Sequence, residues 1–271
     1  MNSSSSSGMD FFLCLRLATV EAWRGADYDI HADGAGELPG PRHYEPGAGK
    51  PMDYTAARER MVDTQLRPNA ITDTRILTAM LDVARETYVP ATLRNMAYLD
   101  EDLPLGGEGG ASRFLMEPMT FAKLVQLADI AADDLVLDVG AATGYTSAVI
   151  SRLCGAVVGL EADESLASDA TDALAEGGFD NVAVFTGPLE AGFASQGPYD
   201  VIIFEGAVEQ VPDVFFAQLR DGGRLAAVVQ DGPIGRATLF VKTGDNISGS
   251  VAFDANIRTL PGFARAPEFV F

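Results

Sequence analysis

Residues 135–147 constrain the fold more than any other part of this 271-residue chain, and they read LVLDVGAATGYTS. An apolar run ends in an acid and breaks into a glycine turn, and a helical pattern follows through residues 148–153. This order predicts a strand, a tight loop and a helix N-terminus, which is the usual start of a nucleotide-type cofactor site. Gly140 and Gly144 lack a Cβ atom, so a ligand can lie close to the backbone there.

The spacing of these glycines narrows the choice of cofactor. The loop reads G-x-x-x-G, whereas dinucleotide sites use G-x-G-x-x-G and phosphate loops end in G-K-[ST]. Asp138 precedes the loop, no Lys or Arg lies in it, and Glu161 ends the next apolar run about 20 residues on, where an acid binds ribose hydroxyls. These features favour S-adenosylmethionine, a cation without phosphate. The competing interpretation is an ordinary α/β turn followed by a solvated glutamate.

Composition limits the partners of the chain. The formal net charge is −20 and the sequence pI is about 4.3, so we expect neither nucleic acid nor an anionic membrane surface as a partner. The two cysteines, Cys14 and Cys154, do not suggest a disulfide scaffold, and we expect buried thiols in a cytoplasmic protein.

Histidine usage restricts the chemistry. His31 and His43 are the two histidines, so the chain from Met52 onward contains none. This argues against Ser-His-Asp and Cys-His hydrolysis and against histidine-based metal sites, and we expect no metal. Methyl transfer to a carboxylate fits the restriction, because the acceptor is already ionised at neutral pH and the donor is already activated.

The first 51 residues differ from the rest of the chain. They contain a serine run at 3–7 and a segment rich in glycine and proline at 34–49, a composition that favours disorder. Phe11–Leu15 resembles a short signal-peptide core, but no basic residues precede it and Arg16 interrupts it. We expect residues 1–51 to be disordered, or to be a mis-called extension of a protein that starts at Met52.

The remaining pattern predicts helices first and alternating strands and helices afterwards. Amphipathic helices are expected at 54–66 and from 72–73 onward, a turn-rich loop at 102–110, and a helix that begins at Pro118. Strands are expected at 135–139, 157–161, 182–185, 200–205 and 224–230, helices at 144–153, 164–177 and 209–219, and a terminal hairpin at 237–253. This is an α/β fold with a mainly parallel sheet, and ligands of such sheets bind at the carboxyl ends of the strands.

Several blocks of sequence resemble the protein-L-isoaspartate O-methyltransferase family, in consistent order from Tyr54 to Arg224. The first block consists of 58–62, 65–66, 71, 73, 79–80 and 88–90, the next of 97–98, 100 and 103–106, and the last of 199–203, 211–212, 218–219 and 222–225. The first and last blocks are more specific than the glycine loop, which many methyltransferases share. The resemblance implies a Rossmann-like class I methyltransferase with a seven-stranded sheet, a C-terminal antiparallel hairpin and an N-terminal helical cap. Residues 52–118 would form the cap and substrate loop, and residues 119–271 the S-adenosylmethionine-binding domain.

The resemblance also implies an activity and a set of cofactor residues. Family members methylate the carboxyl group of isoaspartyl residues in damaged proteins, and the ester then closes to a succinimide. Glu161 would bind the ribose, and the adenine would lie near Gly187 to Leu189. Glu205 follows the fourth strand, where it would bind the cofactor's ammonium group, shape the substrate pocket or simply be solvated. The complete set of cofactor residues implied by position is Asp138, Gly140, Ala141, Thr143, Gly144, Glu161, Leu189 and Glu205.

The substrate segment departs from the family pattern. The family carries Thr-Ile-Ser-Gln-Pro, and this chain reads Phe114-Leu-Met-Glu-Pro118, so Met116 replaces the serine and Glu117 the glutamine. Either Ser112 and Glu117 serve the reaction by another path, or Met116 packs and Glu117 caps the helix. A small-molecule acceptor, or a homologue that binds without catalysis, therefore stays open beside an isoaspartyl protein or peptide.

Overall fold

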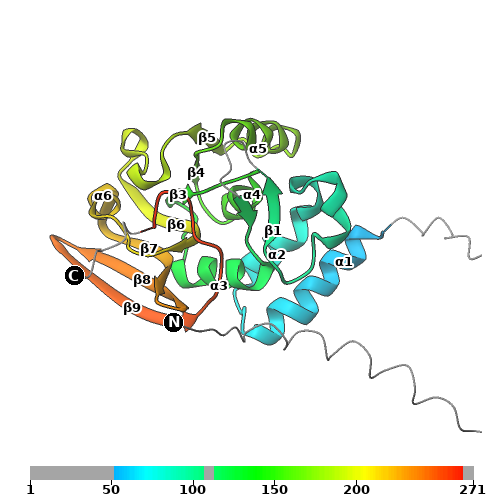
Figure 1. Ribbon diagram of the computed structural model, residues 1–271, viewed down its shortest axis with the longest axis horizontal. Coiled ribbons are helices and arrows are strands. Elements are labelled where there is room, and N and C mark those ends of the chain that lie inside the picture. The colour runs from blue at the N-terminus through cyan, green and yellow to red at the C-terminus, as the bar shows by residue number, and fades with distance from the viewer. Residues whose placement is uncertain (1–51, 107–112, 265–271) are drawn as a thin grey trace, which may run out of the picture. The chain divides into compact units, whose positions relative to one another are not determined.

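A seven-stranded sheet organises the computed structural model, which describes residues 52–106 and 113–264. The strand order is β5-β4-β3-β6-β7-β8-β9 (Figure 1). The pairs among the first five strands are parallel, and the pairs β7–β8 and β8–β9 are antiparallel. The expected mainly parallel sheet with a terminal antiparallel hairpin is confirmed.

The strands and helices have the following bounds. The strands are β1 Leu103–Gly106, β2 Arg113–Leu115, β3 Leu135–Val139, β4 Ala156–Glu161, β5 Val182–Thr186, β6 Tyr199–Val208, β7 Leu219–Asp231, β8 Ile234–Thr243 and β9 Asn246–Asp254. The α-helices are α1 Tyr54–Met61, α2 Thr74–Asp82, α3 Pro118–Ala128, α4 Tyr145–Ser151, α5 Glu164–Glu176 and α6 Asp213–Gln218. Short helical turns include η1 Val62–Leu66, η3 Arg85–Tyr88, η4 Ala91–Met96 and η6 Leu189–Ala191.

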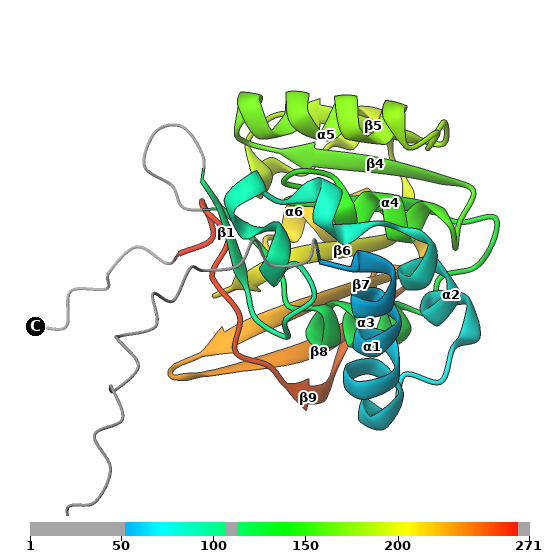
Figure 2. The same cartoon turned by 90° about the vertical axis from the view of Figure 1, so that its right-hand side faces the viewer.

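Each face of the sheet buries its own apolar core. Alternation along β3 sends Val136 into the core that includes residues of α1 to α5, and Leu137 into the core that includes α6. Ile203 and Phe204 of β6 divide between the same two cores. Figure 2 shows α5 beside β4 and β5, with β8 and β9 at the other end of the sheet. Both faces of the central strands are therefore covered, as in parallel sheets generally.

The helices begin where the sequence places capping residues. Asp73 precedes α2 and its carboxylate accepts the Arg75 N–H at 2.8 Å, and Pro118 is the first residue of α3. Asp53 caps α1 in the same way through the N–H of Ala56. These starts match the sequence expectations.

Two expected elements differ in the structure. The helix expected at 209–219 begins only at Asp213, because β6 continues to Val208 with its last residues buried and paired to β7. Residues 103–106, expected within a loop, form β1 and pair with β2. Leu103 and Leu105 alternate with exposed neighbours, which is a strand pattern that the surrounding prolines and glycines obscured.

The segment after β9 closes over the end of β6. Ala207 N–H donates to the Arg258 carbonyl, and Leu260 N–H donates to the Ala207 carbonyl, both at 2.8 Å. A Cβ atom on Gly206 would lie 2.7 Å from Leu260 Cγ, so only glycine lets the two segments approach this closely. Leu260 thereby reaches the loop that follows β3.

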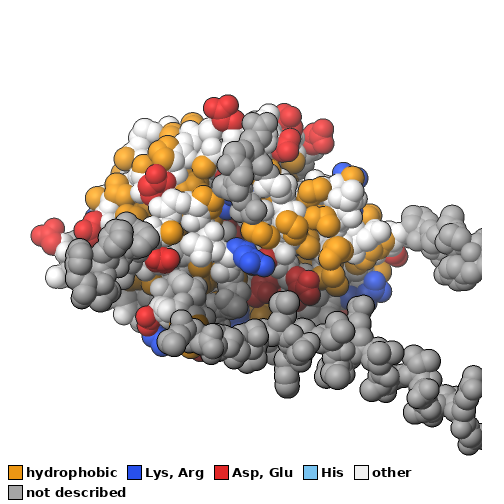
Figure 3. Space-filling model, in the orientation of Figure 1, with side chains coloured by type: hydrophobic (Ala, Val, Ile, Leu, Met, Phe, Trp, Pro, Cys, Tyr) orange, Lys and Arg blue, Asp and Glu red, His pale blue; other side chains and the backbone are white. Residues whose placement is uncertain are grey.

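The surface carries the acidity seen in the composition. Figure 3 shows acidic side chains scattered over several parts of one face of the molecule. Within residues 52–106 and 113–264, no helix has both the length and the apolar character needed to cross a bilayer.

A cavity mutation in the central strand tests the two-core arrangement. Ile203 is fully buried, so Ile203→Ala should lower the free energy of unfolding by about 2 to 5 kcal/mol. The control is Val251→Ala on β9, which is 60% exposed and should change stability by less than about 0.5 kcal/mol. Urea denaturation measures both, and equal losses would contradict the assigned core.

Candidate functional site

Four of the predicted cofactor residues meet at the carboxyl edge of the sheet. The parallel register places Val139 opposite Leu160 on β4 and opposite Phe204 on β6. Asp138, Gly140, Glu161 and Glu205 adjoin these positions, so the three carboxylates and the glycine turn lie at one level of three neighbouring strands. All three carboxylates are at least 94% buried, with exposed fractions of 0%, 0% and 6%.

The loop between β3 and α4 is tightly wound. Gly140, Ala142 and Gly144 have φ values of 90°, 50° and 91°, a left-handed conformation that explains glycine at two of the three positions. The N–H groups of Gly140 and Ala141 both donate to the Leu160 carbonyl, at 2.8 and 3.1 Å. The loop is therefore fixed to the end of β4, as the strand–turn–helix pattern predicts.

Asp138 lies beneath this loop and anchors α4. Its Oδ2 accepts hydrogen bonds from the hydroxyl groups of Thr146 at 2.8 Å and Ser147 at 2.5 Å. Its Oδ1 is buried and has no hydrogen-bond partner among the described residues. Burial raises the pKa of Asp138 to about 6, against the two hydroxyl hydrogen bonds that lower it.

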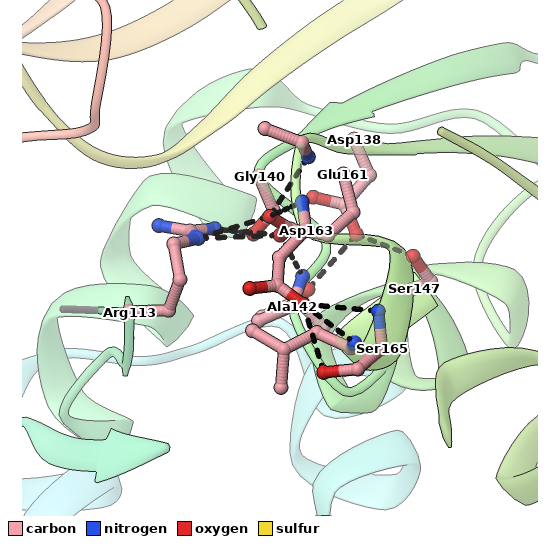
Figure 4. A network of polar contacts seen from close by, with 11 residues as sticks. Arg113, Asp138, Gly140, Ala142, Ser147, Glu161, Asp163 and Ser165 are labelled. Atoms are coloured by element: carbon pink, nitrogen blue, oxygen red, sulfur yellow. Dashed lines mark hydrogen bonds and ion pairs between the residues drawn. The ribbon is translucent and has the colours of Figure 1, made fainter. Parts of the chain in front are cut away.

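Glu161 forms an ion pair with Arg113, the first residue of β2. Arg113 Nη2 lies 2.8 Å from Glu161 Oε2 and 2.8 Å from the Gly140 carbonyl, and its Nε lies 3.1 Å from Glu161 Oε1. Figure 4 shows the guanidinium pointing at Glu161 and Gly140. Arg113 is only 4% exposed. Sequence analysis missed Arg113, because nothing in the pattern of residues 102–118 distinguishes an inward-facing arginine.

Glu205 is buried, and its carboxylate has no hydrogen-bond partner within residues 52–106 and 113–264. Both carboxylate oxygens lack a hydrogen bond to any described residue, so Glu205 is not the solvated strand end that sequence analysis left open. Burial raises the pKa of Glu205 well above its usual value, and the negative charge of Asp138 adds to this. The nearby positive charges of Arg113 and Arg85 lower it.

The other predicted cofactor residues lie in the loop after β3 or in an apolar core. Ala141 and Gly144 belong to the loop, and the hydroxyl of Thr143 donates to the Tyr88 carbonyl at 2.6 Å, which ties the loop to η3. Leu189 begins η6 and is 1% exposed within the core that includes α6. Ser112 lies outside the described residues.

The segment before α3 is held by a buried arginine. Arg85 is fully buried, and it donates to the carbonyls of Ala97 at 2.7 Å and Met116 at 2.6 Å. Its guanidinium carbon lies 4.7 Å from the centre of the Tyr145 ring, a cation–π contact. Burial lowers the pKa of Arg85 below its usual value. Met116 is 3% exposed and packs in the core, as one of the two sequence interpretations expects.

Glu117 follows at the N-terminus of α3, and its carboxylate accepts a hydrogen bond from the Thr120 hydroxyl. Burial raises the pKa of Glu117, while the Thr120 hydrogen bond opposes the rise. Glu117 also borders a groove of about 680 Å³. The groove is lined by Glu101, Asp102, Glu117, Gln230, Asn256, Ile257, Arg258 and Thr259.

The groove shares part of its lining with the surroundings of Glu205. A second, very small cavity of about 10 Å³ is bordered by Glu205 and Met116, and it shares Asp102, Ile257 and Arg258 with the groove. An acceptor in the groove would therefore approach the carboxyl end of β6, next to the glycine loop. This adjacency is what a group-transfer site requires.

The buried polar groups fit a cationic adenosyl ligand. Asp138 Oδ1 and both oxygens of Glu205 have no partner among the described residues, which is costly unless a ligand supplies one. Gly140 lets Leu260 and Arg113 approach the turn closely, because a Cβ atom there would lie 2.8 Å from Leu260 Cδ2 and 2.9 Å from Arg113 Nη2. The oxygens of Glu161, which would meet ribose hydroxyls, are held by Arg113. Among the described residues, no cluster of side chains could hold a metal ion.

Comparison with known proteins decides the family. The family model described as Protein-L-isoaspartate(D-aspartate) O-methyltransferase (PCMT) matches residues 56–258. The chain belongs to this family. The match includes α1, the segment before α3, the glycine loop and the segment after β9.

Individual relatives agree with the family assignment. Protein-L-isoaspartate O-methyltransferase 2 of Anaeromyxobacter sp. (strain Fw109-5) is 37% identical over 184 residues, covering 68% of this chain and 73% of the relative. The enzyme named protein-L-isoaspartate O-methyltransferase of Herpetosiphon aurantiacus is 33% identical over 216 residues, covering 78% and 94%.

Solved structures confirm the fold. A protein-L-isoaspartate O-methyltransferase superposes with a TM-score of 0.68 at 25% identity, covering 76% of this chain and 66% of that chain. A Plasmodium falciparum structure, titled as a complex with S-adenosyl-L-homocysteine, has a TM-score of 0.62 at 16% identity and covers 76% and 97%. The Rossmann-like methyltransferase fold, the family resemblance and S-adenosylmethionine as the family's cofactor are thus confirmed. The residue assignments stay predictions.

A substitution at Gly140 tests how closely the side chains of Leu260 and Arg113 approach the turn after β3. Gly140→Ala would place a Cβ atom 2.8 Å from Leu260 Cδ2 and 2.9 Å from Arg113 Nη2, at a φ of 90°. We expect a loss of about 2 to 4 kcal/mol in the free energy of unfolding. Gly222→Ala is the matched control, because φ is 77° there and no atom lies within 4 Å, so about 1 kcal/mol should be lost. Equal losses in thermal denaturation would argue against crowding at the turn.

Asp138 tests the electrostatics of the site. Its folded-state pKa of about 6 exceeds the usual 3.8, so protonation favours the folded state and this stability disappears as pH rises from about 4 through 6. Asp138→Asn removes the titration. Between pH 4 and pH 7 wild type should lose up to about 3 kcal/mol relative to the variant. Asp254→Asn, at an exposed position on β9, should follow wild type, and parallel curves for wild type and Asp138→Asn would refute the raised pKa.

Proposed function

We propose that the protein transfers a methyl group from S-adenosylmethionine to the carboxylate of isoaspartyl residues in damaged proteins or peptides. The observation that carries the proposal is the family match over residues 56–258, which spans the acceptor side and the cofactor side of the site together. The groove in front of α3 supports it, because it shares Asp102, Ile257 and Arg258 with the small cavity that borders Glu205.

We infer a division of labour along the chain. Residues 52–118 would form the cap and the acceptor side, since Glu117 and its neighbours before α3 border the groove. Residues 119–271 would bind the cofactor, through the loop after β3 and Glu161, the acid that ends β4. Arg258 is the basic residue among those lining the groove, so it is the residue we expect to meet an acceptor carboxylate.

The proposed chemistry asks the protein to position rather than to move protons. S-adenosylmethionine, when bound, supplies an activated methyl group. The acceptor carboxylate is ionised at neutral pH, so no general base is needed to prepare it. The glycine loop would hold the donor, the groove would align the acceptor carboxylate in line with it, and the buried surroundings would exclude water.

We assign no proton-transfer step to Glu117. Its hydrogen bond with Thr120 and its place at the N-terminus of α3 give it a structural role, and its position in the groove lets it select the residues that flank an isoaspartate. A cytoplasmic location fits the proposal, because Cys154 is a free buried thiol and the acceptors would be intracellular proteins.

Peptide methylation tests the proposal. With labelled S-adenosylmethionine, an isoaspartyl peptide should yield an alkali-labile methyl ester, and the same peptide with normal aspartate should yield none. The methylation assay uses the full 271-residue chain. Cofactor binding without transfer to the isoaspartyl peptide would refute the proposed acceptor. Labelling of a small-molecule carboxylate or hydroxyl instead would establish another acceptor class.

A further inference from the structure

Arg113 occupies the hydrogen-bonding positions that a ribose would need. Its guanidinium bonds both oxygens of Glu161 and the carbonyl of Gly140, and it is 96% buried by the residues around it. The pair is bidentate, with one short bond at 2.8 Å, which is the strong form of an arginine–carboxylate contact.

Glu161 has no capacity left for another donor. Besides Arg113, its oxygens accept the backbone N–H groups of Ala142 at 2.7 Å, Ala162 at 2.8 Å and Asp163 at 3.1 Å. A carboxylate offers about four lone-pair sites. The three backbone bonds and the bonds from Arg113 already fill these sites. A ribose hydroxyl can therefore donate to Glu161 only after the guanidinium has left it, while the three backbone bonds remain.

A second carboxylate lies within reach of the same guanidinium. An ideal Cβ atom on Gly140 would lie 2.9 Å from Arg113 Nη2 and 3.7 Å from Glu205 Cβ, so Arg113 and Glu205 border the same point above the turn. Glu205 is 6% exposed, and neither of its oxygens has a partner among the described residues. Asp138 also lies nearby, but two hydroxyl groups already bond its Oδ2.

We propose that Arg113 is a switching residue that competes with the cofactor's ribose for Glu161 and moves to Glu205 when the ribose binds. A buried guanidinium without a counter-ion is strongly destabilising, so a displaced Arg113 requires another carboxylate. Glu205 meets that need without breaking an existing hydrogen bond. The inference rests on cofactor binding by this loop and does not depend on which acceptor is methylated.

This exchange makes cofactor affinity depend on the difference in free energy between the Arg113–Glu161 and Arg113–Glu205 ion pairs. With Arg113 on Glu161 the ribose site is closed, so the observed affinity is the intrinsic affinity reduced by the fraction of molecules in which Arg113 has moved. Glu205 favours the moved position. Arg113 thus weakens ribose binding and Glu205 restores part of the loss.

Equilibrium binding of adenosine tests the inference without turnover. Adenosine carries the ribose but lacks the amino-acid part, so its affinity includes the ribose contact at Glu161 and excludes contacts to the amino-acid part. Arg113→Gln should bind adenosine at least about fivefold more tightly than wild type. Glu205→Gln should bind it about threefold or more weakly, and Glu205→Gln added to Arg113→Gln should change nothing further, because the two effects act through one contact.

Arg220→Gln is the matched control. Arg220 pairs with Asp200 at the opposite end of β6, so the substitution should leave adenosine affinity at the wild-type value. If Arg113→Gln does not fold, as judged by circular dichroism, Arg113→Lys replaces it. Lysine cannot form the bidentate fork, so adenosine should bind more tightly than to wild type.

Three results would overturn the inference. Unchanged or weaker adenosine binding by the Arg113 variants would show that Arg113 does not compete. Weaker S-adenosylhomocysteine binding by Glu205→Gln in both backgrounds, with adenosine unaffected, would assign Glu205 to the amino-acid part instead. If neither adenosine nor S-adenosylhomocysteine binds to any variant, the glycine loop is not a cofactor site. If adenosine and S-adenosylhomocysteine bind but no methyl group is transferred to isoaspartyl peptide, the proposed function is refuted and the inference about Arg113 is not affected.

Discussion

The candidate site depends on three carboxylates that are buried toward the carboxyl ends of adjoining parallel strands. Asp138, Glu161 and Glu205 lie around one glycine turn, and each would lose much of its hydration on folding. The three carboxylates differ in the donors that bond them. Two hydroxyl groups donate to Asp138, and an arginine and three backbone N–H groups donate to Glu161. No group among the described residues donates to Glu205. This gradient from satisfied to unsatisfied acid is what makes the site receptive to a cation.

The part of the fold that could be predicted is the part governed by local pattern. The strand–turn–helix at residues 135–147 and the helix that begins at Pro118 follow from apolar periodicity and from the backbone freedom of particular residues. The short hairpin β1–β2 could not be predicted, because Pro104 and the glycines around it suggest a loop until pairing across six intervening residues supplies the hydrogen bonds. The late start of α6 likewise reflects a tertiary contact, the extension of β6 by pairing with β7.

The acidic residues of the candidate site could be predicted from the sequence, whereas its arginines could not. Spacing from the glycine loop indicates Glu161, because an acid at the end of the next strand has a recognised role. Arg113 and Arg85 carry no such signal, since an arginine in sequence is far more often exposed than buried. Both arginines neutralise or pack against groups that are distant in the chain, and only the fold brings them together. The substitution at Met116 becomes intelligible for the same reason, since the Met116 carbonyl, rather than its side chain, is bonded by Arg85.

The closure of the glycine turn by Leu260 has a consequence for the order of events during synthesis. The turn at Gly140 is made early in translation, whereas the residues that cover it, from Ile257 to Leu260, emerge about 120 residues later. The sheet up to β7 can form on the ribosome with this pocket still open to water. Closure of the turn is therefore a late event, which must wait for the residues after β9.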